Sequence, residues 1–182
     1  MAIITRRAAL TDATELHKLA ADTFVLATPQ GTLAEDIEAF VAEHLAQASF
    51  ERYLTDPSRI ILLAKDAEVP VGYSMLIGGP PSDPEVAAVV GSALPSGTGE
   101  AIELSKFYVV AANHGSGVAA TLMAATIDAA TATGARLCWL GVNQFNERAA
   151  RFYAKHGFEI IGTKRFRVGA VWHDDHVRAR AL

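Results

Sequence analysis

The 182-residue chain has a single cysteine, Cys138, so it cannot form an internal disulfide or build a thiolate metal site. No apolar run approaches the roughly 20 residues that a membrane-spanning helix needs. The first ten residues reach two arginines after very few apolar residues, which is unlike a secretory signal peptide. We therefore expect a soluble, cytoplasmic protein with no membrane partner.

Basic charge is also scarce. Sixteen Lys and Arg stand against 20 Asp and Glu, for a net charge of −4. Because binding to a phosphate backbone depends on excess positive charge, nucleic acid is not an expected partner. Hydrophobic residues make up 51% and charged residues 20%, which excludes a disordered tail or a rod. The length predicts one domain, residues 1–182.

Hydrophobic periodicity predicts an α/β chain with the order β-α-α-β-β-β-α-β-α-β-β. The predicted strands are 2–10, 59–65, 70–77, 101–110, 137–142, 158–168 and 171–182. The predicted helices are 11–23, 117–133 and 146–156, together with a helical region 32–54 that either is continuous or is broken near Ser49. Breaks in the pattern are predicted at 29–31, and a turn is predicted at Gly169. Capping boxes are predicted for Asp12 with Glu15 and for Thr32 with Glu35. The stretch Gly78–Gly99, rich in proline and small residues, is predicted to be a long irregular loop.

The stretch Tyr108–Ala119 runs from a strand through a small-residue loop into a helix. Small side chains let a ligand approach the backbone, and the first N–H groups of a helix can bind an anion such as a diphosphate. A tight turn without a ligand is the alternative, since Gly115-Ser116-Gly117 alone is a weak signal. A dinucleotide site is disfavoured, because the next strand ends at Asn143 and not at an acidic residue.

The stretch Asn146–Phe158 resembles the acceptor-side signature of the GNAT superfamily of acetyl-CoA-dependent N-acetyltransferases. The pattern Asn-x-x-Ala-x-x-Phe-Tyr-x-x-x-Gly-Phe matches at Asn146, Ala149, Phe152, Tyr153, Gly157 and Phe158. The earlier stretch is similar to that family's pyrophosphate motif, Arg/Gln-x-x-Gly-x-Gly/Ala, at His114, Gly117 and Ala119. The resemblance covers roughly residues 100–160 and extends further by element order only.

This resemblance implies the GNAT fold, a mixed and mostly antiparallel sheet of about seven strands, flanked by about four helices and splayed between strands 4 and 5. It implies acetyl-CoA as the cosubstrate and no metal. The implied cofactor-binding residues are Tyr108, Val109, Val110, His114, Gly115, Ser116, Gly117, Val118, Ala119, Asn146 and Tyr153. His114 stands where the family has Arg or Gln. The resemblance therefore implies phosphate binding by the backbone amides of the loop, and it leaves open whether the His114 side chain contacts the cofactor.

Two catalytic residues are implied by position in the family pattern. Tyr153 would assist the departing thiolate, although it could also be a core aromatic like Phe152. Glu103 would be the base, with Glu100 as the fallback, although Glu103 could also be a solvent-facing carboxylate. The N–H of Val109 or a neighbour would stabilise the oxyanion. Asn146 is either a helix N-cap or a cofactor ligand, or both.

Other polar clusters are interpreted as structural. His173-Asp174-Asp175-His176 lacks a further cluster that would complete a metal site, so we expect a polar turn or strand entry. Cys138 lies in an apolar strand and is expected to be inert. The acidic residues Glu35, Asp36, Glu38 and Glu43 could attract a cationic amine but are more typical of a solvated helix face.

A softer resemblance, carried by Glu103–Val118, Leu140–Val142 and Gly162–Leu182, is to the PaiA-type bacterial polyamine acetyltransferases. It suggests a small-molecule primary amine, polyamine-like, as the acceptor. A protein N-terminus or lysine, an antibiotic amine, and a non-catalytic acyl-CoA-binding sensor remain alternatives. The oligomeric state is left open, a homodimer included.

Overall fold

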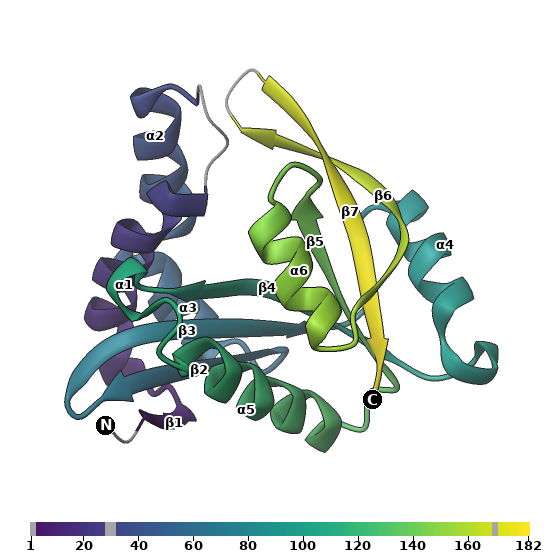
Figure 1. Cartoon of the computed structure of the whole chain (residues 1–182), viewed down its shortest axis with the longest axis horizontal. Coiled ribbons are helices and arrows are strands. Elements are labelled where there is room, and N and C mark those ends of the chain that lie inside the picture. Colours follow the sequence, from purple (N-terminus) through teal and green to yellow (C-terminus); the bar gives the residue numbers. More distant parts are fainter. Residues whose placement is uncertain (1–2, 28–31, 169–170) are drawn as a thin grey trace. The chain divides into compact units, whose positions relative to one another are not determined.

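The computed structural model describes residues 3–27, 32–168 and 171–182 (Figure 1). Within these ranges the strands are β1 Ile3–Arg7, β2 Arg59–Asp66, β3 Val69–Gly78, β4 Ala101–Val109, β5 Leu137–Asn143, β6 Glu159–Val168 and β7 Val171–Ala181. The helices are α1 Ala13–Ala27, α2 Ala34–His44, α3 Gln47–Thr55, α4 Pro84–Ala93, α5 Val118–Ala132 and α6 Glu147–Lys155. Short 3-10 turns cover Leu10–Asp12, Pro95–Gly97 and Ala111–Asn113. The predicted breaks at 29–31 and Gly169 lie outside the described residues.

The strands form one seven-stranded sheet in the order β1-β2-β3-β4-β5-β7-β6. β4 and β5 are parallel, whereas β1–β2, β5–β7 and β6–β7 are antiparallel. The β4–β5 ladder covers only three pairs, from Ala101–Leu137 to Glu103–Trp139, although both strands continue well beyond it. The expected mixed sheet, open between its fourth and fifth strands, is confirmed.

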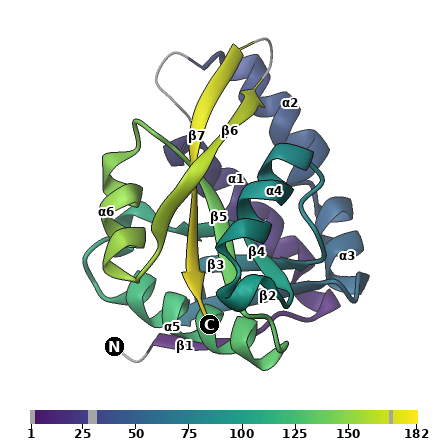
Figure 2. The ribbon, with the colours of Figure 1, turned by 90° about the vertical axis from the view of Figure 1, so that its right-hand side faces the viewer.

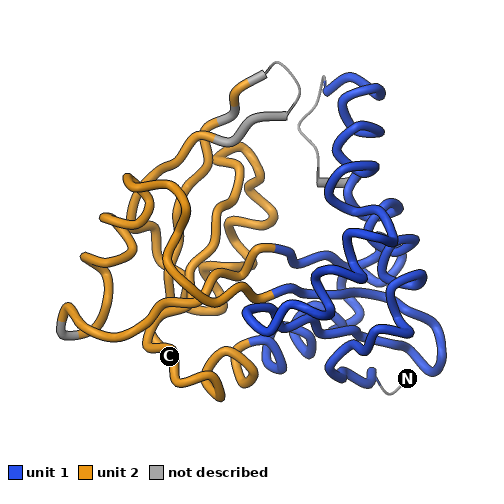
Figure 3. Tube along the Cα trace, turned by 180° about the vertical axis from the view of Figure 1, so that it is seen from behind, with its two compact units in different colours: residues 1–75, 106–126 blue, residues 76–105, 127–182 orange. Residues whose placement is uncertain are grey.

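Contacts divide the chain into two compact units (Figure 3). Unit 1 comprises residues 1–75 and 106–126, and unit 2 comprises residues 76–105 and 127–182. β4 and α5 each contribute residues to both units.

In unit 1, α1 packs against α2 and α3, and the rings of Phe24 and Phe40 stack with centroids 4.4 Å apart. The predicted Asp12–Glu15 capping box is wrong. The Asp12 carboxylate instead accepts the Ala9 N–H at 2.7 Å and two N–H groups of Arg6, both at 2.7 Å. The charged partner of Glu15 is Lys65, at 3.0 Å, so tertiary ion pairs replace the expected local cap.

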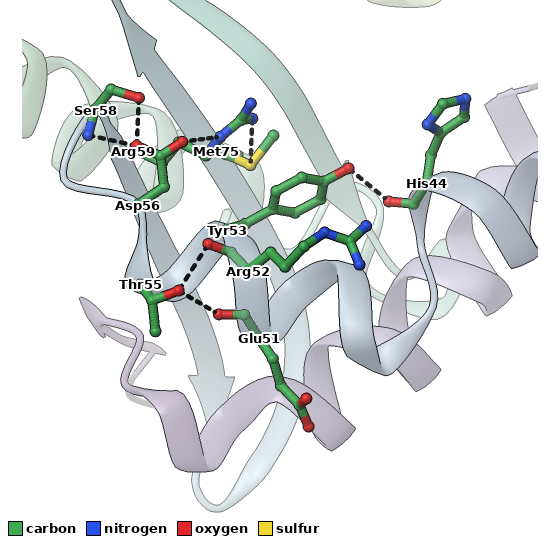
Figure 4. A network of polar contacts seen from close by, with 9 residues as sticks. All are labelled: His44, Glu51, Arg52, Tyr53, Thr55, Asp56, Ser58, Arg59 and Met75. Carbon is green, nitrogen blue, oxygen red and sulfur yellow. Dashed lines mark hydrogen bonds and ion pairs between the residues drawn. The ribbon is translucent and has the colours of Figure 1, made fainter.

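The predicted helical region 32–54 is two helices, and the break lies at the buried Leu45 and not near Ser49. The carbonyl oxygens that lose their helical partners at this break are contacted by a histidine ring and a tyrosine hydroxyl from other helices of unit 1. His17 contacts the Leu45 carbonyl at 2.7 Å, and the Tyr53 hydroxyl donates to the His44 carbonyl at 3.1 Å (Figure 4). The N-cap of α2 is Leu33 and its side chain cannot cap, so the predicted box from Thr32 to Glu35 is also wrong.

In unit 2, the strands β5, β7 and β6 carry α4 on one face and α6 on the other (Figure 2). The predicted irregular loop Gly78–Gly99 is wrong in its middle, where α4 forms. Asp83 caps this helix by accepting the N–H groups of Glu85 at 2.8 Å and Val86 at 3.4 Å. Val86 and Val90 on α4 are buried in one core cluster with β5 and β7 side chains, which gives the helix an apolar seat.

The remaining predicted elements agree with the structure to within a few residues. The predicted hairpin at Asp66–Glu68 is present, with Ala67 at φ 52°. The helix after Asn146 ends before Gly157, which has φ 81° and so takes the expected left-handed C′ position. None of the described helices is both long and apolar enough to cross a membrane.

Candidate functional site

The loop between β4 and α5, in unit 1, has an unusual backbone. Gly115 and Gly117 have φ angles of +85° and +92°. Among the described residues, apart from each glycine and its two chain neighbours, no heavy atom lies within 4 Å of the position that a Cβ would occupy at either residue. Glycine is therefore needed here for its backbone angle and not because neighbours crowd it. The space beside both residues is open.

Several N–H groups around the start of α5 have no acceptor. Thr121 is the first residue whose N–H makes a helical bond, to the Gly117 carbonyl at 3.0 Å. Within the described part of the chain, no hydrogen bond is made by the N–H groups of Gly115, Gly117, Val118, Ala119 and Ala120. A run of free amides at the start of a 15-residue helix fits an anion such as a diphosphate.

His114 and Ser116 brace this loop internally. His114 Nε2 lies 2.9 Å from the Val109 carbonyl oxygen, so Nε2 carries the proton. This Nε2 proton is therefore not available to a phosphate. The Ser116 hydroxyl donates to the Asn113 carbonyl at 2.6 Å, so both polar side chains hold the turn in shape.

The end of β4 lies close against β3. The position of a Cβ at Gly72 lies 2.9 Å from the Tyr108 carbonyl oxygen and 3.0 Å from Val109 Cγ2. Tyr108 stacks on Tyr73 with ring centroids 5.5 Å apart. Burial raises the pKa of Tyr108 to about 12, and burial, with the nearby Tyr108, raises the pKa of Tyr73 well above its usual range. Both hydroxyls therefore stay protonated.

The N–H groups of Val109 and Val110 point in opposite directions. The Val110 N–H donates to the Val71 carbonyl of β3 at 2.9 Å. Because successive N–H groups of a strand point to opposite edges, the Val109 N–H points to the other edge of β4, away from β3. Val109 is thus the better donor of the two for a bound carbonyl oxygen.

Glu103 lies in unit 2, on the part of β4 that pairs with β5. It is half-buried and in register with Trp139. Neighbouring Cys138 is fully buried, and burial raises its pKa to about 12, with a smaller contribution from Glu103 in the same direction. A thiol in that state is a poor nucleophile, in agreement with the interpretation of Cys138 as inert packing. The fallback base, Glu100, is exposed just before β4.

The two predicted residues of α6 also lie in unit 2. Asn146 Oδ1 accepts the Ala149 N–H at 3.0 Å, which confirms its role as the N-cap. Tyr153 is half-buried, with its ring edge-on to Phe152 at 5.6 Å and to Phe158 at 5.8 Å. Asn146 still has its Nδ2 donor, since the cap uses only the carbonyl oxygen.

The structure therefore brings Tyr108–Ala119 together as one continuous loop and strand end in unit 1. Glu103, Asn146 and Tyr153 belong to unit 2, on β4 and α6. The four acidic residues of α2 include no buried side chain, as expected for a solvated face. Within the described ranges, no group of three or more His, Cys, Asp or Glu residues could hold a metal ion.

A polar cluster in unit 2 escaped sequence reasoning. Lys164 on β6 places Nζ 5.5 Å from the centroid of the Trp139 ring on β5, beside Gly141 and the buried Asp175. Trp139, Gly141 and Asp175 lie on β5 and β7 and meet Lys164 of β6 only through strand register, so no local spacing could have revealed the cluster.

Comparisons with known proteins agree on one family. The model of the Acetyltransferase (GNAT) family matches residues 15–158. Uncharacterized N-acetyltransferases of Mycobacterium bovis and Mycobacterium tuberculosis are 45% identical to this chain over 173 residues, which cover 95% of this chain and 99% of theirs.

Solved structures share the fold at low sequence identity. A PaiA N-acetyltransferase from Thermoplasma acidophilum has a TM-score of 0.77 and 17% identity, with 100% of both chains covered. A GCN5-related N-acetyltransferase from Rhodopseudomonas palustris has a TM-score of 0.72 and 20% identity, covering 100% of this chain and 97% of that one. With the family match over most of its length, this chain belongs to the GNAT family of acetyl-CoA-dependent N-acetyltransferases.

Proposed function

We propose that this N-acetyltransferase moves the acetyl group of acetyl-CoA directly to a primary amine of a small molecule, with polyamine-like amines as the first class of acceptor to test. The observation that carries the cofactor part is the loop before α5, where two left-handed glycines and a run of unpartnered amides surround open space. The PaiA structure from Thermoplasma acidophilum is a complex with coenzyme A, which supports the same assignment.

The amides of Gly115, Gly117, Val118 and Ala119 would hold the diphosphate of the cofactor. Helix-terminal N–H groups bind phosphate oxygens without needing a basic side chain. Ser116 would contribute by its place in the loop, since its hydroxyl already bonds Asn113. His114 would act mainly by bracing the loop, because its Nε2 proton is engaged with the Val109 carbonyl.

The reaction needs three further groups. Val109 would donate its N–H to the thioester oxygen as negative charge develops there, while Val110 is held by β3. Tyr108 would shape this strand end through its stack on Tyr73. Glu103, directly or through a water, would take the proton that the amine loses as the C–N bond forms.

Breaking the C–S bond leaves the electron pair on sulfur. Tyr153 would donate its hydroxyl proton, or a hydrogen bond, to that thiolate, and Asn146 would offer its free Nδ2 to the cofactor near the start of the same helix. Tyr153 lies in a half-buried aromatic setting, which would strengthen such a hydrogen bond by excluding water.

The test is release of thiol from acetyl-CoA across a panel of amines, comparing the wild type with Tyr153→Phe. We expect Tyr153→Phe to lower kcat by about 10²-fold, in the range of general acid catalysis, with unchanged folding. Tyr53→Phe, on α3 in unit 1, is the matched tyrosine control and should keep its turnover.

Full turnover by Tyr153→Phe on a good acceptor would rule out the role of Tyr153. Turnover of protein N-termini, lysines or antibiotic amines in preference to small amines would change the acceptor class. Calorimetric binding of coenzyme A with no turnover on any amine would instead identify a non-catalytic acyl-CoA-binding sensor.

A further inference from the structure

The side chain of Lys164 lies across Gly141 in unit 2. The position of a Cβ at Gly141 is in contact with Lys164 Cε and lies 2.7 Å from its Nζ. The same point lies 3.5 Å from Asp175 Oδ2, and Asp175 is the cross-strand partner of Lys164 on β7. Lys164 thus occupies a cradle formed by Trp139, Gly141 and Asp175.

This cradle has the features of a site for an organic cation. The Trp139 ring presents its face to Nζ at 5.5 Å from the centroid, within the range of a cation–π interaction. Asp175 is only 7% exposed, so its carboxylate attracts a nearby cation with little screening by water. Gly141 leaves room for the cation, because any larger residue there would occupy the space that the Lys164 side chain fills.

The cradle lies one strand away from the proposed base. Glu103 on β4 is in register with Trp139 on β5, and paired strands run about 4.8 Å apart. A cation over Trp139 therefore lies in the same unit as Glu103, above the strand that pairs with the proposed base. The cradle would not serve the reacting nitrogen, because an aromatic face and a carboxylate favour the ammonium form, which cannot attack a carbonyl carbon.

We propose that the cradle of Trp139, Gly141 and Asp175 binds the second, non-reacting ammonium of a diamine or polyamine acceptor, and that Lys164 is a built-in competitor that this ammonium displaces. This inference rests on the proposed function, because it assigns an acceptor class to that same enzyme. Lys164 then sets how strongly the enzyme prefers acceptors with two amines over acceptors with one.

The kinetic test compares 1,5-diaminopentane with pentylamine, which share a reacting amine and differ in the second cation. Lys164→Ala empties the cradle, so the ratio of kcat/KM for the diamine over the monoamine should rise about fivefold, mainly through a lower KM for the diamine. Lys164→Arg keeps a resident cation and should restore a ratio near that of the wild type. Lys18→Ala, at an exposed lysine of α1, is the matched control and should leave the ratio unchanged.

The binding test needs no turnover and so separates this proposal from the proposed function. Calorimetry should show 1,5-diaminopentane binding about fivefold more tightly to Lys164→Ala than to the wild type, and Asp175→Asn in the same background should remove that gain. Unchanged or weaker diamine binding by Lys164→Ala would overturn the proposal. If no amine is acetylated but the binding gain is present, the proposed function fails and the cation site stands.

Discussion

Gly72 shows how one residue can position the end of β4. A Cβ at this position would lie 2.9 Å from the Tyr108 carbonyl oxygen, which is backbone and cannot rotate away. We therefore expect Gly72→Ala to push β4 outward at Tyr108–Val109 and to lower the free energy of unfolding by about 1–3 kcal/mol. It should also lower kcat, because it would displace the Val109 N–H, the proposed donor to the reacting carbonyl.

Gly91 on α4 is the matched control for that substitution. Gly91 lies inside a helix, and among the described residues no heavy atom outside the neighbouring helix backbone lies within 4 Å of its Cβ position. Gly91→Ala should therefore stabilise the protein by up to about 1 kcal/mol and leave kcat unchanged. Urea unfolding and steady-state kinetics on both variants measure the two effects. Equal stability changes in the two variants would show that the close approach to Tyr108 carries no strain.

At the scale of elements, α4 depends on a single side-chain cap. Asp83 Oδ1 satisfies the N–H groups of Glu85 and Val86 at the start of the helix. Asp83→Ala should cost about 1 kcal/mol, whereas Asp83→Asn keeps an acceptor oxygen and should cost much less. Hydrogen exchange on α4 should therefore rise in the Ala variant only. The packing of Val86 and Val90 with Trp139 is the other contribution to the stability of this helix. Unaltered exchange there would mean that packing, and not the cap, holds the helix.

The elements also show which parts of the fold were predictable. The caps and glycines at Asn146, Gly157 and Gly134 are local signals, so the ends of α5 and α6 agree with the sequence. α4 was missed because its small residues and flanking prolines suggest a loop, and because the apolar surface on which it packs is formed by strands distant in sequence. The break in the second helical region is at Leu45 and not near Ser49 for a similar reason, since the carbonyls at this break are contacted by His17 and Tyr53 from other helices.

The same distinction applies to the candidate site. The glycine loop before α5 lies within twelve consecutive residues, so its geometry follows from local backbone preferences. The cradle around Lys164 depends on the register of β5, β6 and β7, which no short-range spacing encodes. The local geometry was therefore predictable where the chain is contiguous, and unpredictable where strand pairing brings distant residues together.

For the whole molecule, the net charge of −4 is compatible with a phosphate-bearing cofactor because backbone amides, and not basic side chains, are available at the start of α5. The net negative charge would also attract a cationic acceptor. Binding that depends on amides should vary less with salt than binding by several Lys and Arg side chains would.

The stability of the whole molecule should depend on pH through Asp12. Its carboxylate accepts hydrogen bonds from Arg6 and, with a smaller effect, from the Ala9 N–H. Together, and against the opposing effect of burial, these lower the pKa of Asp12 to about 2 from an ordinary value of 3.8. A group whose pKa is lowered by folding stabilises the folded state when it is ionised. The contribution should be complete above about pH 4 and should be lost as the pH falls from 4 towards 2. Because the Arg6 side chain is 43% exposed, we expect about 1–2 kcal/mol.

Urea unfolding of the wild type and Asp12→Asn across this range isolates the contribution from the other carboxylates. Asn keeps an acceptor for the Ala9 N–H but cannot ionise, so the difference in unfolding free energy should be largest near pH 6 and should shrink towards pH 2. Arg6→Gln, which removes the cation and keeps Asp12, should show a similar loss near pH 6 with a reduced dependence on pH. A difference between the wild type and Asp12→Asn that stays constant from pH 6 to pH 2 would mean that the packing of Asp12, and not its charge, stabilises unit 1.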